Sequence, residues 1–300
     1  ILSIPNSFFI SFINKIIHRK KLFTWIHYQD LEIEAAFNLN IIKGKYPKKV
    51  ILFIERLMLN QIDVISTISS GMIKRIKNKL RDSKKLLYLP NFIDSHIFEI
   101  NSCSEIHNPF LEYLDFKNGK KIIMYSGTFN EKISYQTILE TIEILKDRKD
   151  IFWIFSGEGP REKFFRDKLT GFKNCIITKF QPEDKLPYWI NIADIHLIPQ
   201  KLSVEDLVLP SKLLAILSSK KPIIGFAKEG TDLGNILDIA GIRIGDESAL
   251  TLSRAIINLI NNPDLRTKLG IAGNQYVKLN HDKQIVLKQL LNKINNIYNL

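Results

Sequence analysis

The sequence predicts an α/β protein built on parallel β-sheets, and three observations support this prediction. From Lys120 onward, short apolar runs alternate with stretches in which apolar residues recur at helical spacing. The connections between them are short, as in repeated βα units whose parallel sheet is covered by helices on both faces. The chain of 300 residues is also long enough for two domains, at roughly 150 residues each.

The second half of the chain gives the clearest alternation. A buried strand is expected at 120–127, ending at Gly127, and a helix at 135–148 places Ile138, Ile142 and Leu145 on one face. Further strands are expected within 151–160, 174–180, 195–200 and 221–227, and further helices at 161–170, 183–193, from about Pro210, and at 231–241. The remainder from Ala249 is expected to be mostly helical, with breaks at 262–263 and 280–281.

The first hundred residues are expected to form part of a second α/β domain. Strands are predicted at 21–30, 63–70 and 86–94, with helices at 49–61 and 71–81. About three strands are few for a sheet of this class, which usually has about five or six. The chain also begins with Ile rather than Met, within a run of apolar residues, so we expect the natural protein to extend further at its N-terminus.

The predicted domain organisation follows from these patterns. Residues 1–100 form an incomplete domain, 101–119 a polar linker, 120–283 a second domain, and 284–300 a C-terminal helix.

Composition narrows the classes of partner. The net charge of +12, from 43 Lys and Arg against 31 Asp and Glu, favours an anionic partner. Nucleic acid is not expected, because the basic residues are dispersed and no recognised binding module is present. Cys103 and Cys175 are far apart, which indicates a reducing, cytoplasmic location without a disulfide framework or metal cluster.

No apolar run is long enough to predict a membrane-spanning helix. The segment Ser7–Lys21 places Phe and Ile beside His, Lys and Arg. It is either a peripheral anchor on anionic lipid or an ordinary amphipathic helix of the first domain.

Candidate binding groups follow the strands, because parallel α/β sheets bind ligands at the C-terminal ends of their strands. Gly127 and Thr128 allow backbone amides to approach a phosphate, with Lys132 close behind. Lys212 follows Pro210 at an expected helix start, where the helix dipole disfavours a cation. A bound anion explains that placement, so the two lysines are candidates to clamp a diphosphate; alternatively, each lysine simply faces solvent.

Other motifs are less specific. The sequence GEG at 157–159 fails as a dinucleotide fingerprint because position 162 is Glu, so a tight turn is the better interpretation. His27 and Asp30 follow a strand and are either polar groups of a cleft or hydrogen-bonded structural residues. No Asp-x-Asp, G-x-S-x-G or Walker A sequence occurs, which argues against a metal-held nucleotide of the commonest type.

Six segments together resemble bacterial two-domain glycosyltransferases of the large retaining family four, which have the GT-B fold. They read IHYQDLEIEAAFNLNII, YLPNFID, MYSGTFNEK, FSGEGPREKF, LVLPSKLLAILSSKKPII and EGTDLGNILDIAGI, in the family's order and over nearly the whole chain. The colanic-acid and O-antigen type is especially similar. The resemblance implies two Rossmann-like domains with parallel sheets facing across a cleft, the N-terminal one incomplete here, and a last helix that crosses back to that domain.

The resemblance also implies roles for individual residues. Lys132 and the amides around Gly127 and Thr128 are expected to meet the phosphates of a nucleotide-diphosphate sugar, and Phe180 and Gln181 to line its base. The remaining expectations are that Pro210, Ser211 and Lys212 face the diphosphate or ribose, and that His27 and Asp30 lie on the acceptor side.

One departure from the family affects its carboxylates. Many members carry two glutamates separated by seven residues, and this chain has Val204 and Lys212 at those positions. Glu205 and Asp206 are candidate substitutes, one or two positions out of register.

The expected function is therefore transfer of a sugar from a nucleotide-diphosphate sugar, without a metal or other cofactor. The acceptor is a saccharide or a polyprenyl-diphosphate-linked saccharide in O-antigen, capsule or exopolysaccharide synthesis, with retention expected from the resemblance alone. The enzyme would be cytoplasmic, with the inner face of the plasma membrane as a candidate site of attachment; the 300-residue piece itself need not be active.

The residues leave two alternative functions open. A sugar-nucleotide epimerase of the same fold would need acid/base carboxylates, for which Glu32, Glu34 and Glu205 are the candidates. A non-catalytic partner that only binds the donor is favoured by the missing glutamate pair.

Overall fold

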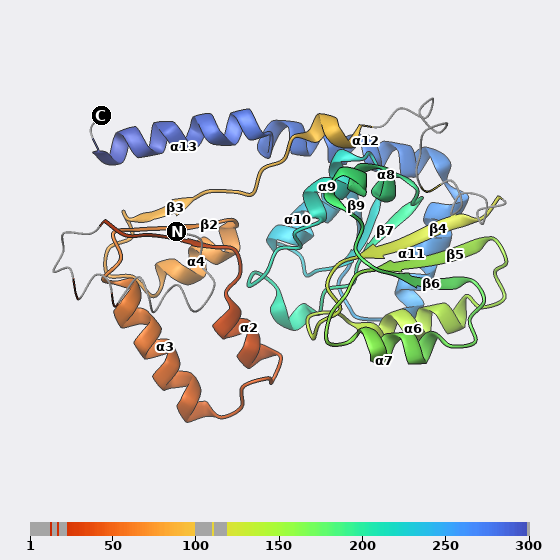
Figure 1. Cartoon of the computed structure of the whole chain (residues 1–300), viewed down its shortest axis with the longest axis horizontal. Helices are drawn as coiled ribbons and strands as arrows, with labels where there is room; N and C mark the ends of the chain where they lie inside the picture. The colour runs from red at the N-terminus through yellow and green to blue at the C-terminus, as the bar shows by residue number, and fades with distance from the viewer. Residues whose placement is uncertain (1–12, 14–16, 18–22, 100–109, 111–118, 299–300) are drawn as a thin grey trace. The chain divides into compact units, whose positions relative to one another are not determined.

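The structure is a computed structural model that describes residues 13, 17, 23–99, 110 and 119–298. The chain forms two compact units (Figure 1). The first contains Ile1–Asn91 and Ser203–Leu209, and the second contains Phe92–Leu202 and Pro210–Leu300. Most of the basic segment 7–21 and of the expected linker 101–119 lies outside the described residues.

The second unit is built on a parallel sheet of six strands in the order β6-β5-β4-β7-β8-β9. The strands are β4 (Lys121–Ser126), β5 (Ile151–Ser156), β6 (Cys175–Thr178), β7 (Ile195–Ile198), β8 (Ile223–Phe226) and β9 (Gly241–Ile244). The parallel sheet predicted from the apolar runs is confirmed. Strand β9 was not predicted, because it begins at Gly241, the residue at which the predicted helix 231–241 ends, with no loop between the two elements.

Helices cover both faces of this sheet, as Figure 1 shows with α6 and α7 on one side and α8 on the other. Ile123 and Tyr125 of β4 belong to the core formed with α6, α7 and α11, whereas Ile122 and Met124 belong to the core formed with α8. This alternation is what a strand buried on both faces requires. The helices are α6 (Tyr135–Ile144), α7 (Glu162–Leu169), α8 (Leu186–Asn191), α9 (Leu213–Ser218), α10 (Asp232–Ala240), α11 (Ala249–Asn261), α12 (Pro263–Asn280) and α13 (Lys283–Tyr298).

The C-terminal helices end close to the predicted breaks. Asn262 separates α11 from α12, and His281 follows α12. The C-terminal helix is confirmed as α13, and its crossing back to the first domain stays a prediction.

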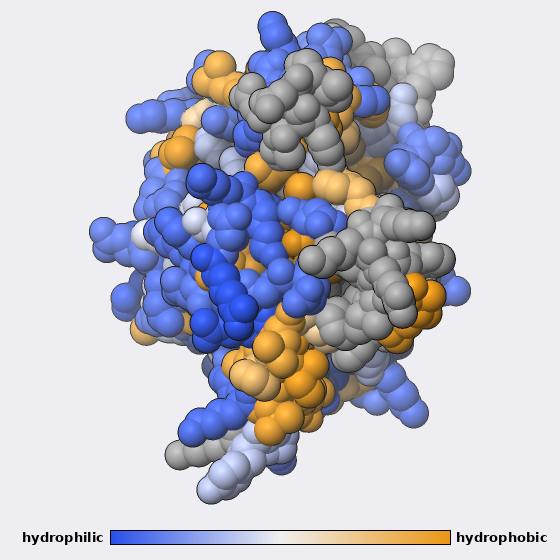
Figure 2. All heavy atoms as spheres, turned by 90° about the vertical axis from the view of Figure 1, so that its left-hand side faces the viewer, coloured by the Kyte–Doolittle hydropathy of each residue, from blue (hydrophilic) through white to orange (hydrophobic). Residues whose placement is uncertain are grey.

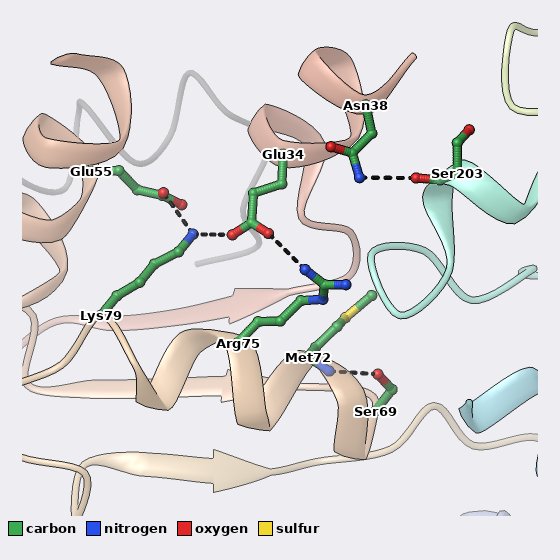
Figure 3. Close-up of polar contacts among 8 residues, drawn as sticks. All are labelled: Glu34, Asn38, Glu55, Ser69, Met72, Arg75, Lys79 and Ser203. Carbon is green, nitrogen blue, oxygen red and sulfur yellow. Dashed lines mark hydrogen bonds and ion pairs between the residues drawn. The ribbon is translucent and has the colours of Figure 1, made fainter. Parts of the chain in front are cut away.

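The first unit contains a parallel sheet of three strands in the order β1-β2-β3. These are β1 (Trp25–Tyr28), β2 (Val64–Thr67) and β3 (Leu86–Tyr88), and the helices are α2 (Glu32–Asn38), α3 (Lys45–Leu59) and α4 (Ser70–Lys77). Helix α3 begins at Lys45, earlier than the predicted 49. Helix α4 begins after Ser69, whose hydroxyl accepts a hydrogen bond from the amide of Met72 at 3.2 Å, an ordinary N-cap (Figure 3).

An ion cluster joins α2, α3 and α4 with the turn after α4, and Figure 3 shows it. The ammonium of Lys79 lies 2.6 Å from the Glu34 carboxylate and 2.7 Å from that of Glu55, and Arg75 reaches Glu34 at 3.3 Å. Burial raises the pKa of Glu55 above its ordinary value, while Lys79 opposes that shift. We call these four residues the Lys79 cluster.

Residues 203–209 pack with the first unit, although the sequence places them inside the second domain. Val204 and Leu207 are buried in the core of the first unit. The amide of Leu31 donates to the Leu207 carbonyl at 2.7 Å, and the Asn38 side chain donates to the Ser203 carbonyl at 2.9 Å (Figure 3). Periodicity could not reveal this, because the two apolar side chains are buried by residues far away in the sequence.

Residues 92–99 pack with the second unit, although the predicted boundary follows residue 100. Ile93 forms a parallel β-bridge with Asp282, and the carboxylate of Glu99 lies 2.7 Å from the ammonium of Lys278 and 3.1 Å from that of Lys220. These charges hold the segment to the second unit beyond the end of β3.

Candidate functional site

The sheet of the second unit has a topological switch point between β4 and β7. From β4 the chain continues through β5 to β6 on one side, and it returns to β7, β8 and β9 on the other. In open α/β sheets, ligands bind outside the carboxyl ends of the strands at such a point. The loops that follow β4 and β7 are therefore the first place to look for a site.

The loop after β4 packs backbone to backbone on the loop after β5. The amide of Gly127 donates to the Ser156 carbonyl at 2.9 Å, and the amide of Phe129 donates to the Glu158 carbonyl at 3.0 Å. A Cβ on Gly157 would lie 1.9 Å from the carbonyl oxygen of Gly127, so no larger residue fits without moving the loop. Residues 157–159 form an irregular connection, and the turn itself follows at 160–161, closed by the bond from the Glu162 amide to the Gly159 carbonyl at 3.0 Å. This connection packs against the loop predicted to bind phosphate.

The segment that carries Lys132 is bonded to the loop after β7. The Lys132 carbonyl accepts from the amide of Lys201 at 2.8 Å, and the amide of Ser134 donates to the Pro199 carbonyl at 2.9 Å. Ile133 forms an antiparallel bridge with Gln200. The two loops of the switch point are thus one bonded structure, and the second of them leads toward Lys212.

Glu247 bonds to both of these loops, and no sequence motif indicates this role. Its carboxylate accepts from the Ser134 hydroxyl at 2.6 Å and from the amide of Leu202 at 2.9 Å. The Thr137 hydroxyl donates to the Glu247 carbonyl at 2.9 Å. Glu247 lies between β9 and α11, more than a hundred residues from Ser134, so only the folded chain brings them together.

Lys212 lies against Phe180, which follows β6. Its ammonium is 5.8 Å from the centre of the Phe180 ring, within cation–π range. Burial lowers the pKa of Lys212, and the Glu183 carboxylate opposes this shift. Two residues predicted separately to bind the donor, one near its diphosphate and one near its base, are therefore neighbours.

The helix after Lys212 differs from the prediction. It begins at Leu213 rather than near Pro210, and it ends at Ser218. Lys212 is its N-cap residue, and a helix of 6 residues has a small dipole. Partial burial is therefore a stronger reason than helix repulsion to expect an anionic ligand at Lys212.

The other predicted donor residues of the second unit have varied exposure. Thr128 and Ser211 are exposed, whereas Gly127, Pro210 and Gln181 are half-buried. The side-chain amide of Gln181 donates to the Lys179 carbonyl at 3.2 Å. Their roles toward a donor stay predictions.

His27 has a partner at each ring nitrogen within the first unit. Its Nδ1 lies 2.9 Å from the Ser66 hydroxyl, and its Nε2 lies 2.8 Å from the Gln29 side-chain nitrogen. If Gln29 donates, then Nε2 accepts and Nδ1 carries the proton toward Ser66. Burial lowers the pKa of His27. This geometry suits the structural alternative, and a role on the acceptor side requires one of these contacts to break.

Asp30, Glu205 and Asp206 belong to the first unit. Asp30 forms an antiparallel bridge with Val208. The carboxylate of Asp206 lies beside Gly71 in the first turn of α4, where a Cβ would be 2.6 Å from its Oδ1. A carboxylate at a helix N-terminus is favourable, which explains this placement of Asp206. The contribution of all three residues to donor or acceptor binding stays a prediction.

The two parallel sheets define a class of fold, and comparison with solved structures identifies it. Sucrose-phosphate synthase from Thermosynechococcus elongatus is 13% identical with a TM-score of 0.76, over 97% of this chain and 72% of that one. Anabaena HepE in complex with UDP-glucose is 9% identical with a TM-score of 0.78, over 97% of this chain and 76% of that one. These likenesses show the GT-B fold.

Residues 111–276 match the family described as glycosyl transferases group 1, and the chain belongs to this family. The putative colanic acid biosynthesis glycosyl transferase WcaI of Escherichia coli (strain K12) is 30% identical over 278 residues, which are 90% of this chain and 67% of that protein. The protein is a nucleotide-sugar glycosyltransferase, as the resemblance implied. Among the described residues, no helix has the length and apolar character needed to cross a bilayer.

Proposed function

We propose that this enzyme transfers a sugar from a nucleotide-diphosphate sugar to a saccharide or a polyprenyl-diphosphate-linked saccharide during surface polysaccharide synthesis. The likeness to a protein described as a colanic acid biosynthesis enzyme supports this pathway class. One observation supports the proposed donor site above all. The two loops at the β4/β7 switch point are hydrogen-bonded to each other, and Lys132 lies in one of them while Lys212 lies beyond the other.

Lys212 and Lys132 are proposed to receive the leaving nucleotide diphosphate. As the bond from the anomeric carbon to the diphosphate oxygen breaks, negative charge grows on that oxygen. Preorganised cations and backbone amides stabilise such charge most strongly where water is partly excluded, and Lys212 is half-buried. The proposal includes no metal, because the two ammonium groups and the amides near Gly127 supply the positive charge.

Phe180 is proposed to contact the nucleoside, with Lys212 moving from its ring to the diphosphate. An ammonium held over an aromatic ring gains about 0.5–2 kcal/mol, and charge-assisted hydrogen bonds to phosphate oxygens compete with that contact. Binding of the donor would therefore release the Phe180 ring as Lys212 turns to the anion.

A thermal-shift screen tests the donor first. UDP, GDP and ADP, each alone and as a sugar conjugate, are compared on the wild-type protein, since a ligand that binds the folded state raises its apparent stability. UDP is the first probe, because HepE was solved with UDP-glucose. Stabilisation by one nucleotide that is lost in Lys212→Ala supports the site, and equal stabilisation of the two proteins contradicts it.

A release assay then tests transfer. The wild-type protein is expected to release free nucleotide diphosphate from the donor faster when a saccharide or a polyprenyl-diphosphate-linked saccharide is present. Donor binding without acceptor-dependent release would instead identify a non-catalytic, donor-binding protein.

A further inference from the structure

Helix α3 of the first unit exposes an apolar stripe. Its outward side chains recur at the helical intervals of 4, 3, 1 and 3 residues. They are Tyr46, Val50, Phe53, Ile54 and Leu57, with exposed fractions of 86%, 57%, 60%, 42% and 45%. Figure 2 shows apolar surface gathered low on this face of the molecule, with hydrophilic surface above it.

The inward face of the same helix is also occupied. Met58 and Leu59 are buried in the core of the first unit, and Glu55 is buried in the Lys79 cluster. The outward stripe is therefore not needed to hold α3 on its own sheet. Contiguous exposed apolar surface of this kind marks an interaction site.

The segment that carries the stripe is mostly cationic in sequence. Residues 40–60 contain one carboxylate, that of Glu55, which is buried and paired with Lys79. Against it stand five cations, at Lys43, Lys45, Lys48, Lys49 and Arg56. Lys49 and Arg56 are exposed, and at four and three residues from Phe53 they lie next to it on the helix surface.

A lipid surface matches this chemistry better than a protein partner does. Interfacial helices combine large apolar residues on one face with Lys and Arg at its border, and the long cationic side chains reach the headgroups. Anionic lipid attracts each nearby cation by about 1 kcal/mol. Ile41 and Ile42, just before α3, are 60% and 38% exposed and extend the apolar surface along the chain.

We propose that the outward stripe of α3 docks on an anionic lipid bilayer. Phe53, Leu57 and Val50 enter the boundary between headgroups and acyl chains, and Lys43, Lys49 and Arg56 contact the anionic headgroups. This goes beyond the proposed transfer reaction and does not depend on the identity of the donor. It also assigns attachment to a different segment from the basic stretch 7–21.

Vesicle sedimentation of the full chain tests the proposal. Vesicles of phosphatidylcholine alone are compared with vesicles that also contain phosphatidylglycerol, at low and at high salt. The wild-type protein is expected to sediment with the phosphatidylglycerol vesicles at low salt, and salt should weaken this binding because it screens exposed charges. Absence of binding at low salt overturns the proposal.

Two variants locate the surface. Val50→Ser/Phe53→Ser/Leu57→Ser should weaken vesicle binding about tenfold or more, from the loss of apolar insertion. Lys43→Gln/Lys49→Gln/Arg56→Gln should weaken it about fivefold per charge on anionic vesicles. Both sets are exposed, so the far-ultraviolet circular dichroism and the thermal midpoint should stay close to wild type.

A matched control uses exposed apolar residues of the second unit. Ile144, Ile271 and Leu279 are exposed by 49%, 45% and 72%, and Ile144→Ser/Ile271→Ser/Leu279→Ser should bind vesicles like the wild type. Undiminished binding of the α3 variants overturns the proposal, because another surface then carries attachment. A wild-type dimer in sedimentation equilibrium that the Val50/Phe53/Leu57 variant converts to a monomer also overturns it, since a second copy then covers the stripe.

Discussion

The two units place their polar and apolar side chains in opposite ways. In the second unit the four central strands, β4, β5, β7 and β8, are buried on both faces, and polar groups gather in the loops at the β4/β7 switch point. In the first unit, charged residues are drawn inward to the Lys79 cluster while α3 shows apolar side chains to the outside. The proposed ligand site of the second unit therefore lies in its loops, whereas the proposed docking surface of the first unit lies on helix α3.

The largest expected effect separates chemistry from folding in the second unit. Lys212→Ala should lower kcat about 10²–10³-fold, because a preorganised cation at the leaving group is lost. The stability of the folded state should change little, since Lys212 is only half-buried. Steady-state kinetics and a thermal melt measure the two effects, with the exposed Lys173→Ala as control.

The pH dependence of donor affinity sharpens this test. Because burial lowers the pKa of Lys212, its ammonium loses a proton at lower pH than a free lysine does. Donor affinity should therefore weaken at alkaline pH in the wild type, and Lys212→Arg, which stays charged, should remove this weakening. An unchanged kcat in a folded Lys212→Ala protein contradicts the proposed role.

The next prediction removes the backbone contact that supports the loop proposed to bind phosphate. Gly157→Ala should lower the free energy of unfolding by about 3 kcal/mol, because its Cβ would overlap the Gly127 carbonyl. Urea unfolding measures this loss. Gly245→Ala is the matched control, since it also follows a strand but its nearest heavy atom, on Arg243, would be 3.8 Å away. Equal stability of the two variants would mean that the loop contact is not tight.

A third test addresses the inward charges of the first unit. Lys79→Met should cost about 2 kcal/mol at neutral pH, because Glu34 and Glu55 lose their shared cation. Urea unfolding at several pH values measures it. Lys146→Met, which breaks the exposed pair with Glu143, should have little effect.

The pH dependence of Lys79→Met has a defined sign. Burial raises the pKa of Glu55 in the folded state, and Lys79 restrains that rise. An acid with a raised folded pKa contributes stability at low pH that is lost as pH rises through that pKa. The variant should therefore approach the wild type in acid and differ most near neutrality. A constant difference across pH would show that the lost contacts are not electrostatic.

The smallest expected effect concerns a positioning residue. Glu247→Gln should lower stability by about 1 kcal/mol, because a charged acceptor for Leu202 and Ser134 becomes neutral. If Glu247 positions the two loops, the donor KM should rise while kcat changes less, and Glu247→Ala should be worse than Glu247→Gln. Glu229→Gln, at an exposed carboxylate, is the control. A stability loss without any change in donor KM would limit Glu247 to a purely structural role.

Much of the second unit could be predicted from the sequence, and less of the first. Buried strands such as 120–127 are continuous apolar runs, and helices such as 135–148 repeat their apolar residues on one face, so local order reports them directly. Strand β9 and helix α2 were not predicted. Strand β9 begins where the preceding helix ends, and α2 buries only Ala35 and Phe37, too few apolar residues to show a helical period. The start of α9 was placed too early, because Pro210 imitates a helix start.

The candidate site, too, could be predicted from the sequence only in part. Gly127 and Lys132 follow β4, and Lys212 lies beyond β7, so their loops could be identified from the order of the strands along the chain. Glu247, the neighbour relation of Lys212 and Phe180, and the partners of His27 could not, because each depends on residues from separate elements.

By itself, the sequence determined the class of fold, the family and the loops that hold the candidate donor site, because these depend on the period of apolar residues and on motifs in a fixed order. Only the tertiary structure decided where the two units divide, which carboxylate holds the switch-point loops together, and which face of α3 stays exposed. Burial and pairing of this kind come from side chains that are distant in sequence and adjacent in space, and no local pattern encodes them.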